Sequence, residues 1–243
     1  MTLLNLLCLP YSGASAMVYT RWRSGLPAWI RVCPVELPGH GARMGEVLQT
    51  ELCPLVRQLA LEQCQAATVP YALFGHSVGA LLAFELVHEL RHLGCPEPLA
   101  LFVSGMAAPT RREDYHADAW REPRSDCELI ADLRSLDGTA DDLLANQDLM
   151  NLMLPIVRAD FLLCGRYVYL ERKPLACALH VLAGQDDRAT GDQLQAWRQE
   201  TTGDFSMRTF PGKHFFIHHY ERSILDHISE VLASERVEER AGN

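Results

Sequence analysis

Closely spaced cysteine pairs are absent from the chain, although it contains eight cysteines. Structural zinc sites use such pairs, and small secreted domains are dense in cysteine, so the spacing fits neither class. The first ten residues, MTLLNLLCLP, have no basic leader and no small-residue cleavage site. No stretch approaches the roughly 18 apolar residues that span a membrane. We therefore expect a cytoplasmic protein without a membrane segment, whose reduced thiols mostly serve as small core residues.

An excess of basic residues is also missing. Lys and Arg number 22 against 31 Asp and Glu, which gives a formal net charge of −9 at pH 7. A charge of this sign disfavours nucleic acid and anionic lipid as partners. The 243 residues, 48% of them hydrophobic, suit one globular domain that needs no metal or disulfide for stability. We expect a monomer with no metal ion and no other cofactor.

Short apolar runs alternate with helical patterns along the chain, which predicts an α/β fold with a mostly parallel sheet and flanking helices. Residues 110–170 interrupt the alternation with charges and with leucines at helical spacing. We interpret this segment as a helical lid inserted into a single domain of residues 1–243. Residues 235–243 are charged, and we expect them to be frayed. Strands are predicted at about 3–9, 30–35, 71–74, 99–104, 178–183 and 205–210, and helices at about 46–66, 80–93, 193–200 and 220–233.

The run Gly75-His76-Ser77-Val78-Gly79 follows a predicted strand and precedes a predicted helix. G-x-S-x-G in this context is the nucleophile elbow of the α/β-hydrolase fold, a tight turn that exposes the serine Oγ above the sheet. The following helix directs backbone N–H groups and a partial positive charge toward a developing oxyanion. The sequence therefore predicts an α/β-hydrolase with Ser77 as nucleophile, and an ordinary turn is the alternative.

A serine hydroxyl becomes a good nucleophile only when a base removes its proton and an acid orients that base. In this fold the partners follow in the order Ser, Asp, His. His214 lies in a Pro-Gly loop just after the last predicted strand, and we predict that it is the base. His218 and His219 are rivals that we interpret as surface or packing residues. His76 adjoins the serine, and we expect its side chain to point away from the Oγ.

Two aspartates follow the predicted strand at 178–183 after a glycine turn. The usual placement after this strand favours Asp187 as the triad acid over Asp186, and one of the two could instead cap the next helix. Asp160 is a weaker alternative. For the oxyanion hole we predict the backbone N–H groups of Val78, after the nucleophile, and of Tyr11, in the loop after the first strand.

Several segments stand out along the chain: LPYSGAS, VELPG with an arginine shortly after, FGHSVGALLAFEL, VSG followed by Ala-Pro, LAGQDD and FPGKHFF. Taken together, these motifs resemble the type II thioesterases that accompany nonribosomal peptide and polyketide synthetases. The chain departs from the family at His40, where members often carry the arginine of PGR, and at Lys213, where they carry the second glycine of PGGHFF. Neither change falls on a predicted triad position. The resemblance covers nearly the whole chain.

The resemblance implies a serine thioesterase that hydrolyses acyl groups from the phosphopantetheine arm of carrier proteins and so clears mis-primed synthetases. Its partners would be the acylated carrier domains of such a synthetase. Arg111, Arg112 and Arg121 near the lid are candidates to meet an acidic carrier, and they are equally well explained as a solvated face. Two alternatives stay open on the residues alone: a small-molecule carboxylesterase or lipase, and a hydrolase-like protein that only binds.

Overall fold

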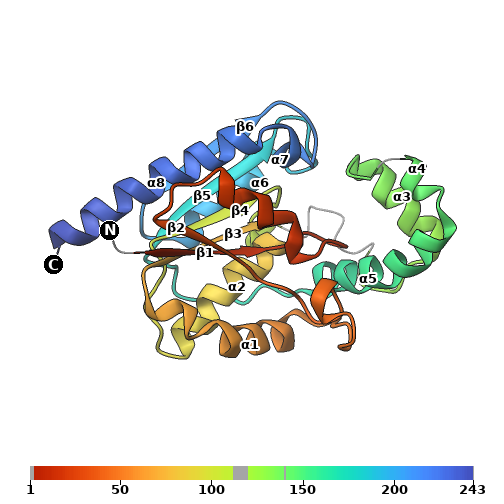
Figure 1. Ribbon diagram of the computed structural model, residues 1–243, viewed down its shortest axis with the longest axis horizontal. Coiled ribbons are helices and arrows are strands. Elements are labelled where there is room, and N and C mark those ends of the chain that lie inside the picture. Colours follow the sequence, from red (N-terminus) through yellow and green to blue (C-terminus); the bar gives the residue numbers. More distant parts are fainter. Residues whose placement is uncertain (1–2, 112–119, 140, 243) are drawn as a thin grey trace.

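The computed structural model describes residues 3–111, 120–139 and 141–242. Within these residues the strands form one six-stranded sheet in the order β2-β1-β3-β4-β5-β6, and every neighbouring pair is parallel (Figure 1). This confirms the predicted parallel sheet. The strands are β1 Leu4–Leu9, β2 Ile30–Pro34, β3 Tyr71–His76, β4 Ala100–Ser104, β5 Ala178–Gly184 and β6 Phe205–Phe210.

Alternate residues of the central strands contribute their side chains to two separate hydrophobic cores, one on each face of the sheet. In β1, Leu7 and Leu9 belong to one core, whereas Leu6 and Cys8 belong to the other. Successive side chains of a strand point to opposite faces, so a strand that is apolar at every position is buried on both. The continuous apolar runs of the sequence are therefore the signature of a sheet that is covered on both faces.

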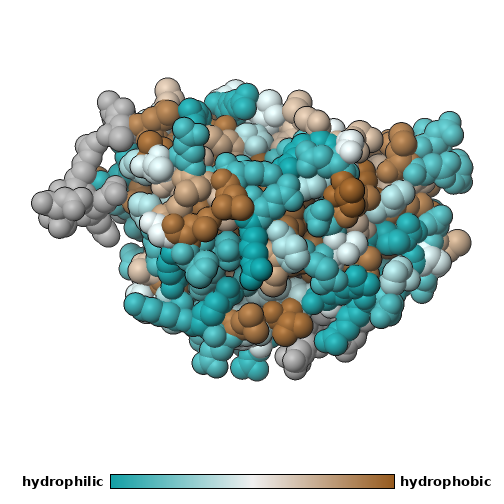
Figure 2. All heavy atoms as spheres, turned by 90° about the horizontal axis from the view of Figure 1, so that it is seen from below, coloured by the Kyte–Doolittle hydropathy of each residue, from teal (hydrophilic) through white to brown (hydrophobic). Residues whose placement is uncertain are grey.

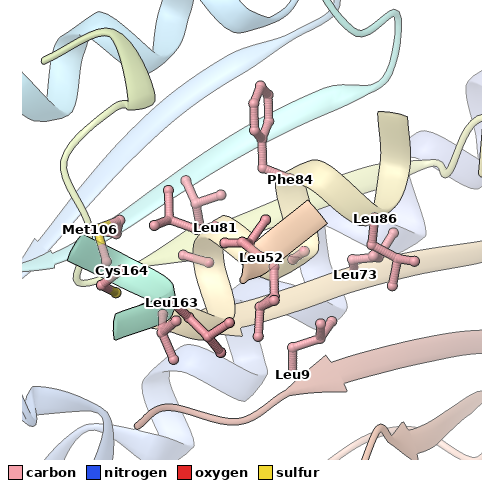
Figure 3. Close-up of a cluster of buried hydrophobic side chains, with 14 of the residues drawn as sticks. Leu9, Leu52, Leu73, Leu81, Phe84, Leu86, Met106, Leu163 and Cys164 are labelled. Carbon is pink, nitrogen blue, oxygen red and sulfur yellow. The ribbon is translucent and has the colours of Figure 1, made fainter. Parts of the chain in front are cut away.

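Helices cover the two faces of this sheet (Figure 1). α1 and α2 lie against one face and α8 against the other, together with the 3₁₀ segment η1 Ala16–Ser24. Figure 3 shows the first core, where Leu9 and Leu73 of the sheet lie near Leu52 of α1 and Leu163 of α5. The helices are α1 Leu52–Gln63, α2 Val78–His92, α3 Asp126–Leu136, α4 Asp141–Leu144, α5 Gln147–Arg166, α6 Gly191–Gln195, α7 Phe216–His219 and α8 Glu221–Gly242.

Helices α3, α4 and α5 lie between β4 and β5 in the chain, and we call residues 126–166 the helical insertion. Figure 1 shows α3 and α4 projecting from the body of the molecule beyond one end of the sheet. Ser125 and Glu128 form a capping box that begins α3, whose leucines Leu129, Leu133 and Leu136 are buried. The predicted helical character of this segment is confirmed for the described residues, and residues 112–119 and 140 lie outside them.

Two local predictions were wrong. Helix α1 begins at Leu52 rather than near residue 46. Helix α8 continues to Gly242 through residues 235–242, which we expected to be frayed. This end of the chain is rich in Glu and Arg, which are strong helix formers, so helix propensity extends the helix past its last buried leucine, Leu232.

The cysteines are less buried than we expected. All eight are free thiols, and only Cys8, Cys164 and Cys177 are buried. Cys53 and Cys127 are exposed, and each is the second residue of its helix.

The surface on the α1 side is mainly hydrophilic, and its hydrophobic side chains lie in separate groups (Figure 2). Scattered apolar residues of this kind are normal on soluble proteins. None of the helices within the described ranges combines the length and the apolar character needed to cross a membrane.

The packing of α1 makes a matched test possible. Leu59 is fully buried, whereas Leu61, two residues later, is 69% exposed. We predict that Leu59→Ala lowers the free energy of unfolding by about 2–5 kcal/mol, because it removes buried methyl groups and leaves a cavity. Leu61→Ala should change it by less than about 0.5 kcal/mol. Urea denaturation measures both values, and equal losses would contradict this packing.

Candidate active site

The candidate site lies where the direction of strand addition reverses. β2 lies on one side of β1 and β3 on the other, so the connections that leave β1 and β3 diverge. In open α/β sheets a crevice forms outside the carboxyl ends of such strands, and ligands bind there. Tyr11 follows the carboxyl end of β1, and Ser77 follows that of β3. The topology therefore brings these two distant residues to one crevice.

Ser77 occupies a strained turn between β3 and α2. Its φ of 57° and ψ of −125° are rare for a residue with a side chain. A Cβ atom on Gly75 would lie 2.0 Å from the Gly79 carbonyl oxygen, and one on Gly79 would lie 2.4 Å from the Leu9 carbonyl oxygen. The two glycines are therefore required by the close approach of the backbone, as the motif predicts.

His214 and Asp187 form a buried pair beside the serine. His214 Nδ1 donates to Asp187, at 2.9 Å from Oδ2 and 3.1 Å from Oδ1. The side chains are only 5% and 1% exposed. A carboxylate can only accept here, so Nδ1 carries the hydrogen and Nε2 is left for the cavity that His214 shares with Ser77.

The loops after β5 and β6 are interlocked, which explains why Asp187 rather than Asp186 meets the histidine. The Asp186 N–H donates to the Gly212 carbonyl over 3.0 Å, and the Asp186 residue is exposed. A Cβ on Gly184 would lie 2.4 Å from the Lys213 carbonyl oxygen, so the two loops touch. The geometry supports the predicted preference for Asp187.

The other histidines lie where the sequence suggested. His76 Nδ1 hydrogen-bonds Ser104 Oγ at 2.9 Å, beneath the serine turn. Its complete burial, together with the charges that His214 and His218 would carry, holds the pKa of His76 well below its usual value. A neutral His76 is suited to packing. His218 is exposed and hydrogen-bonds the Tyr11 hydroxyl at 3.3 Å, and His219 is exposed.

Ser77 and His214 line one cavity of about 30 Å³. Most of its wall is apolar and comes from the helical insertion and from the loops that follow β4 and β6, so the site combines a nucleophile with a surface for hydrocarbon. The sequence indicated the leucines of this wall but not its aromatic members. The apolar lining consists of Met106, Trp120, Leu133, Leu136, Phe161, Cys164 and Phe215.

The two predicted oxyanion donors flank this cavity. Val78 is the first residue of α2, where a backbone N–H has no acceptor within the helix. Tyr11 lines the cavity together with Ser12. Among the described residues, no hydrogen bond occupies the Tyr11 N–H.

Asp160, the weaker candidate for the triad acid, lies elsewhere. Its Oδ2 accepts from His40 Nε2 at 3.0 Å and from the Gly13 N–H at 2.7 Å. Sequence reasoning missed this pair. Its signals were an aspartate within an apolar stretch of helix and a histidine in the Pro-Gly-His turn after a strand.

Two of the three arginines that we considered for a carrier, Arg111 and Arg121, are not among the residues that line the cavity. Arg111 lines a polar groove with Thr190 and Gln193. The Arg121 carbonyl accepts from Arg166 Nε at 3.1 Å. Arg112 lies outside the described residues.

Comparison with known proteins supports the same chemistry. The thioesterase domain family matches residues 5–232. The gramicidin S biosynthesis protein GrsT of Aneurinibacillus migulanus is 36% identical over 94% of this chain and 89% of its own.

Solved structures agree in fold and sequence. The RedJ thioesterase of the prodiginine pathway in Streptomyces coelicolor is 36% identical, with a TM-score of 0.86 over 94% of this chain and 85% of its own. The type II thioesterase BorB of the borrelidin biosynthetic cluster is 36% identical, with a TM-score of 0.85 over 95% of this chain and 93% of its own. The chain therefore belongs to the thioesterase domain family and is a type II thioesterase, a hydrolase that acts on thioesters.

Proposed function

We propose that this enzyme hydrolyses acyl groups from the phosphopantetheine arm of carrier domains in a nonribosomal peptide or polyketide synthetase, and so frees arms that carry the wrong or a stalled acyl group. GrsT is named for gramicidin S biosynthesis and BorB for the borrelidin cluster, which supports this assignment by relationship. A cytoplasmic monomer is the state that we propose for the enzyme. No feature of the described residues favours the carboxylesterase or the binding protein over the thioesterase.

The observation that carries the proposal is the shared cavity of Ser77 and His214, with Asp187 bound to the far side of the imidazole. Ser77, His214 and Asp187 form the triad, and the N–H groups of Val78 and Tyr11 form the oxyanion hole. The buried carboxylate fixes the tautomer of His214 and stabilises the imidazolium that forms when the imidazole takes a proton.

The reaction has two halves. Ser77 Oγ attacks the thioester carbon while His214 Nε2 takes its proton, and the two N–H groups stabilise the oxyanion. The C–S bond then breaks, and His214 gives the proton to the departing sulfur, which leaves an acyl-Ser77 ester. Water attacks that ester with His214 again as base, and the carboxylic acid departs as the proton returns to Ser77.

The apolar wall is suited to the acyl group. Because most of the wall is apolar, a hydrocarbon acyl chain can pack against it. Phe161 and Cys164 of this wall belong to α5. We therefore propose that the helical insertion is the lid that contacts the acyl chain.

The substrate class is tested with one acyl group presented on a carrier protein, on coenzyme A and as a p-nitrophenyl ester. We predict that kcat/KM for the carrier exceeds that for the other two by at least about tenfold, because carrier contacts contribute to transition-state binding. A higher kcat/KM for the p-nitrophenyl ester than for the acyl carrier would contradict the proposal and indicate a general esterase.

Removal of the nucleophile is the second test. We expect Ser77→Ala to lower kcat on the acyl carrier by at least about 10³-fold, because no acyl-enzyme can form. Ser24→Ala, at an exposed serine outside the cavity lining, is the control and should retain full activity. Hydrolysis at the wild-type rate by Ser77→Ala would remove Ser77 from the mechanism.

The adjacent aspartates allow a matched comparison of the triad acid. Asp187→Asn should reduce kcat by about 10³–10⁴-fold, because an amide does not hold the imidazole in the required tautomer. Asp186→Asn makes the same chemical change at the exposed neighbour and should leave kcat within about twofold of wild type. Steady-state kinetics measure both, and the reverse order would reassign the acid to Asp186.

A further inference from the structure

α5 contains a buried carboxylate that the triad does not use. Asp160 is 1% exposed, and its Oδ1 has no hydrogen-bond partner within the described part of the chain. Its Oδ2 takes two bonds, from His40 Nε2 and from the Gly13 N–H. Burial of a charge is costly unless the charge is paired, so the Asp160 carboxylate needs an opposite charge or hydrogen-bond donors beside it.

His40 supplies the opposite charge. Its Nδ1 lies 3.0 Å from the Pro38 carbonyl oxygen, which can only accept, and its Nε2 lies 3.0 Å from Asp160 Oδ2. Both ring nitrogens therefore act as donors, which is the pattern of an imidazolium. Burial alone lowers the pKa of His40, but the hydrogen bond and charge of Asp160, the Pro38 carbonyl and the Glu36 charge outweigh it, so that the pKa is raised.

The pair holds the turn that carries the proposed oxyanion donor. The turn from Tyr11 to Ala14 is closed by the Ala14 N–H, which donates to the Tyr11 carbonyl over 3.0 Å. Gly13 has a φ of +77°, and a Cβ there would lie 2.9 Å from Val157 Cγ2 on α5. The turn is thus pressed against α5, and the Asp160 carboxylate fixes the direction of its Gly13 N–H.

Stability alone is a poor explanation for this arrangement. A buried ion pair often adds no net stability over apolar residues of similar size, because desolvation offsets the attraction. The hydrogen bonds of such a pair do, however, fix the orientation of the groups that they join. Here Asp160 of the helical insertion is hydrogen-bonded to the Gly13 N–H, in the turn beside Ser77. Phe161, the next residue of α5, lines the cavity, so the helix that contacts the acyl group also sets the turn.

We propose that Asp160 and His40 are a positioning pair that holds the Tyr11–Ala14 turn against α5 and so keeps the Tyr11 N–H aimed at the oxyanion. This inference rests on the proposed function, because it takes Tyr11 as an oxyanion donor. Neither side chain lines the cavity of Ser77, so both would act through the backbone of the turn.

Asp160→Asn tests the pair with little change in volume. The amide can keep its oxygen at the Oδ2 position, which accepts both bonds, but it removes the negative charge that pairs with His40. A neutral His40 can donate to only one of its two partners, residue 160 or the Pro38 carbonyl, so the hold on the turn is weakened. We expect kcat on the acyl carrier to fall by about 10²-fold, the usual effect of losing one oxyanion donor, with KM within about threefold of wild type. Asp148→Asn makes the same substitution at an exposed site on α5 and should leave both constants unchanged.

A transition-state readout separates positioning from general destabilisation. A trifluoromethyl ketone analogue of the acyl group adds Ser77 Oγ to its carbonyl and places an alkoxide in the oxyanion hole. Its affinity for Asp160→Asn should fall by the same factor as kcat. If Asp160→Asn folds poorly by thermal unfolding, His40→Gln, which keeps a donor for Asp160, should retain far more activity than His40→Ala.

The inference is overturned if kcat and inhibitor affinity of folded Asp160→Asn stay within about twofold of wild type, or if the loss lies in KM alone. Equal activities of His40→Gln and His40→Ala would overturn it as well. These results would leave the triad intact. By contrast, the proposed function itself would be contradicted if the wild-type enzyme did not hydrolyse the acyl carrier, or if Ser77→Ala hydrolysed it at the wild-type rate.

Discussion

The strained turn at Ser77 depends on the contact between two backbones. β3 meets α2 so closely that a methyl group on Gly75 would overlap the Gly79 carbonyl of α2, and a methyl group on Gly79 would overlap the Leu9 carbonyl of β1. This contact holds Ser77 at a positive φ, and the Ser77 N–H donates to the Ser104 carbonyl of β4 over 2.8 Å. The surrounding parallel sheet, buried on both faces, stabilises a conformation that costs about 1–3 kcal/mol in isolation.

The other groups of the site reach Ser77 through the order of the strands. β1 brings the Tyr11 turn from one side, and the loops after β5 and β6 bring Asp187 and His214 from the other. The helical insertion between β4 and β5 then closes the crevice with apolar side chains. The sheet thus positions the reacting groups, whereas the insertion supplies the apolar wall. Through the hydrogen bond between Asp160 and the Gly13 N–H, the insertion also fixes the Tyr11 turn.

Much of this arrangement could be predicted because it depends on local patterns. Apolar runs ending in glycine turns indicated the strands, and the position of each polar residue after its strand indicated Ser77, Asp187 and His214. The pairing of His40 with Asp160 could not be predicted, because 120 residues separate them and only tertiary packing brings them together. The aromatic wall of the cavity depends on tertiary packing in the same way. The end of α8 was not predicted because the helix continues, by its residues' helix propensity, beyond the part that is buried.

The central claim is that the acyl group passes through an ester on Ser77. A chain that carries 2,3-diaminopropionic acid in place of Ser77 tests this most directly, because its amine would form an amide that water does not cleave. After incubation with an acyl carrier, mass spectrometry of the intact chain and of its peptides should find one acyl group on residue 77. A folded chain that stays unmodified, or that carries the acyl group on another residue, would contradict the account.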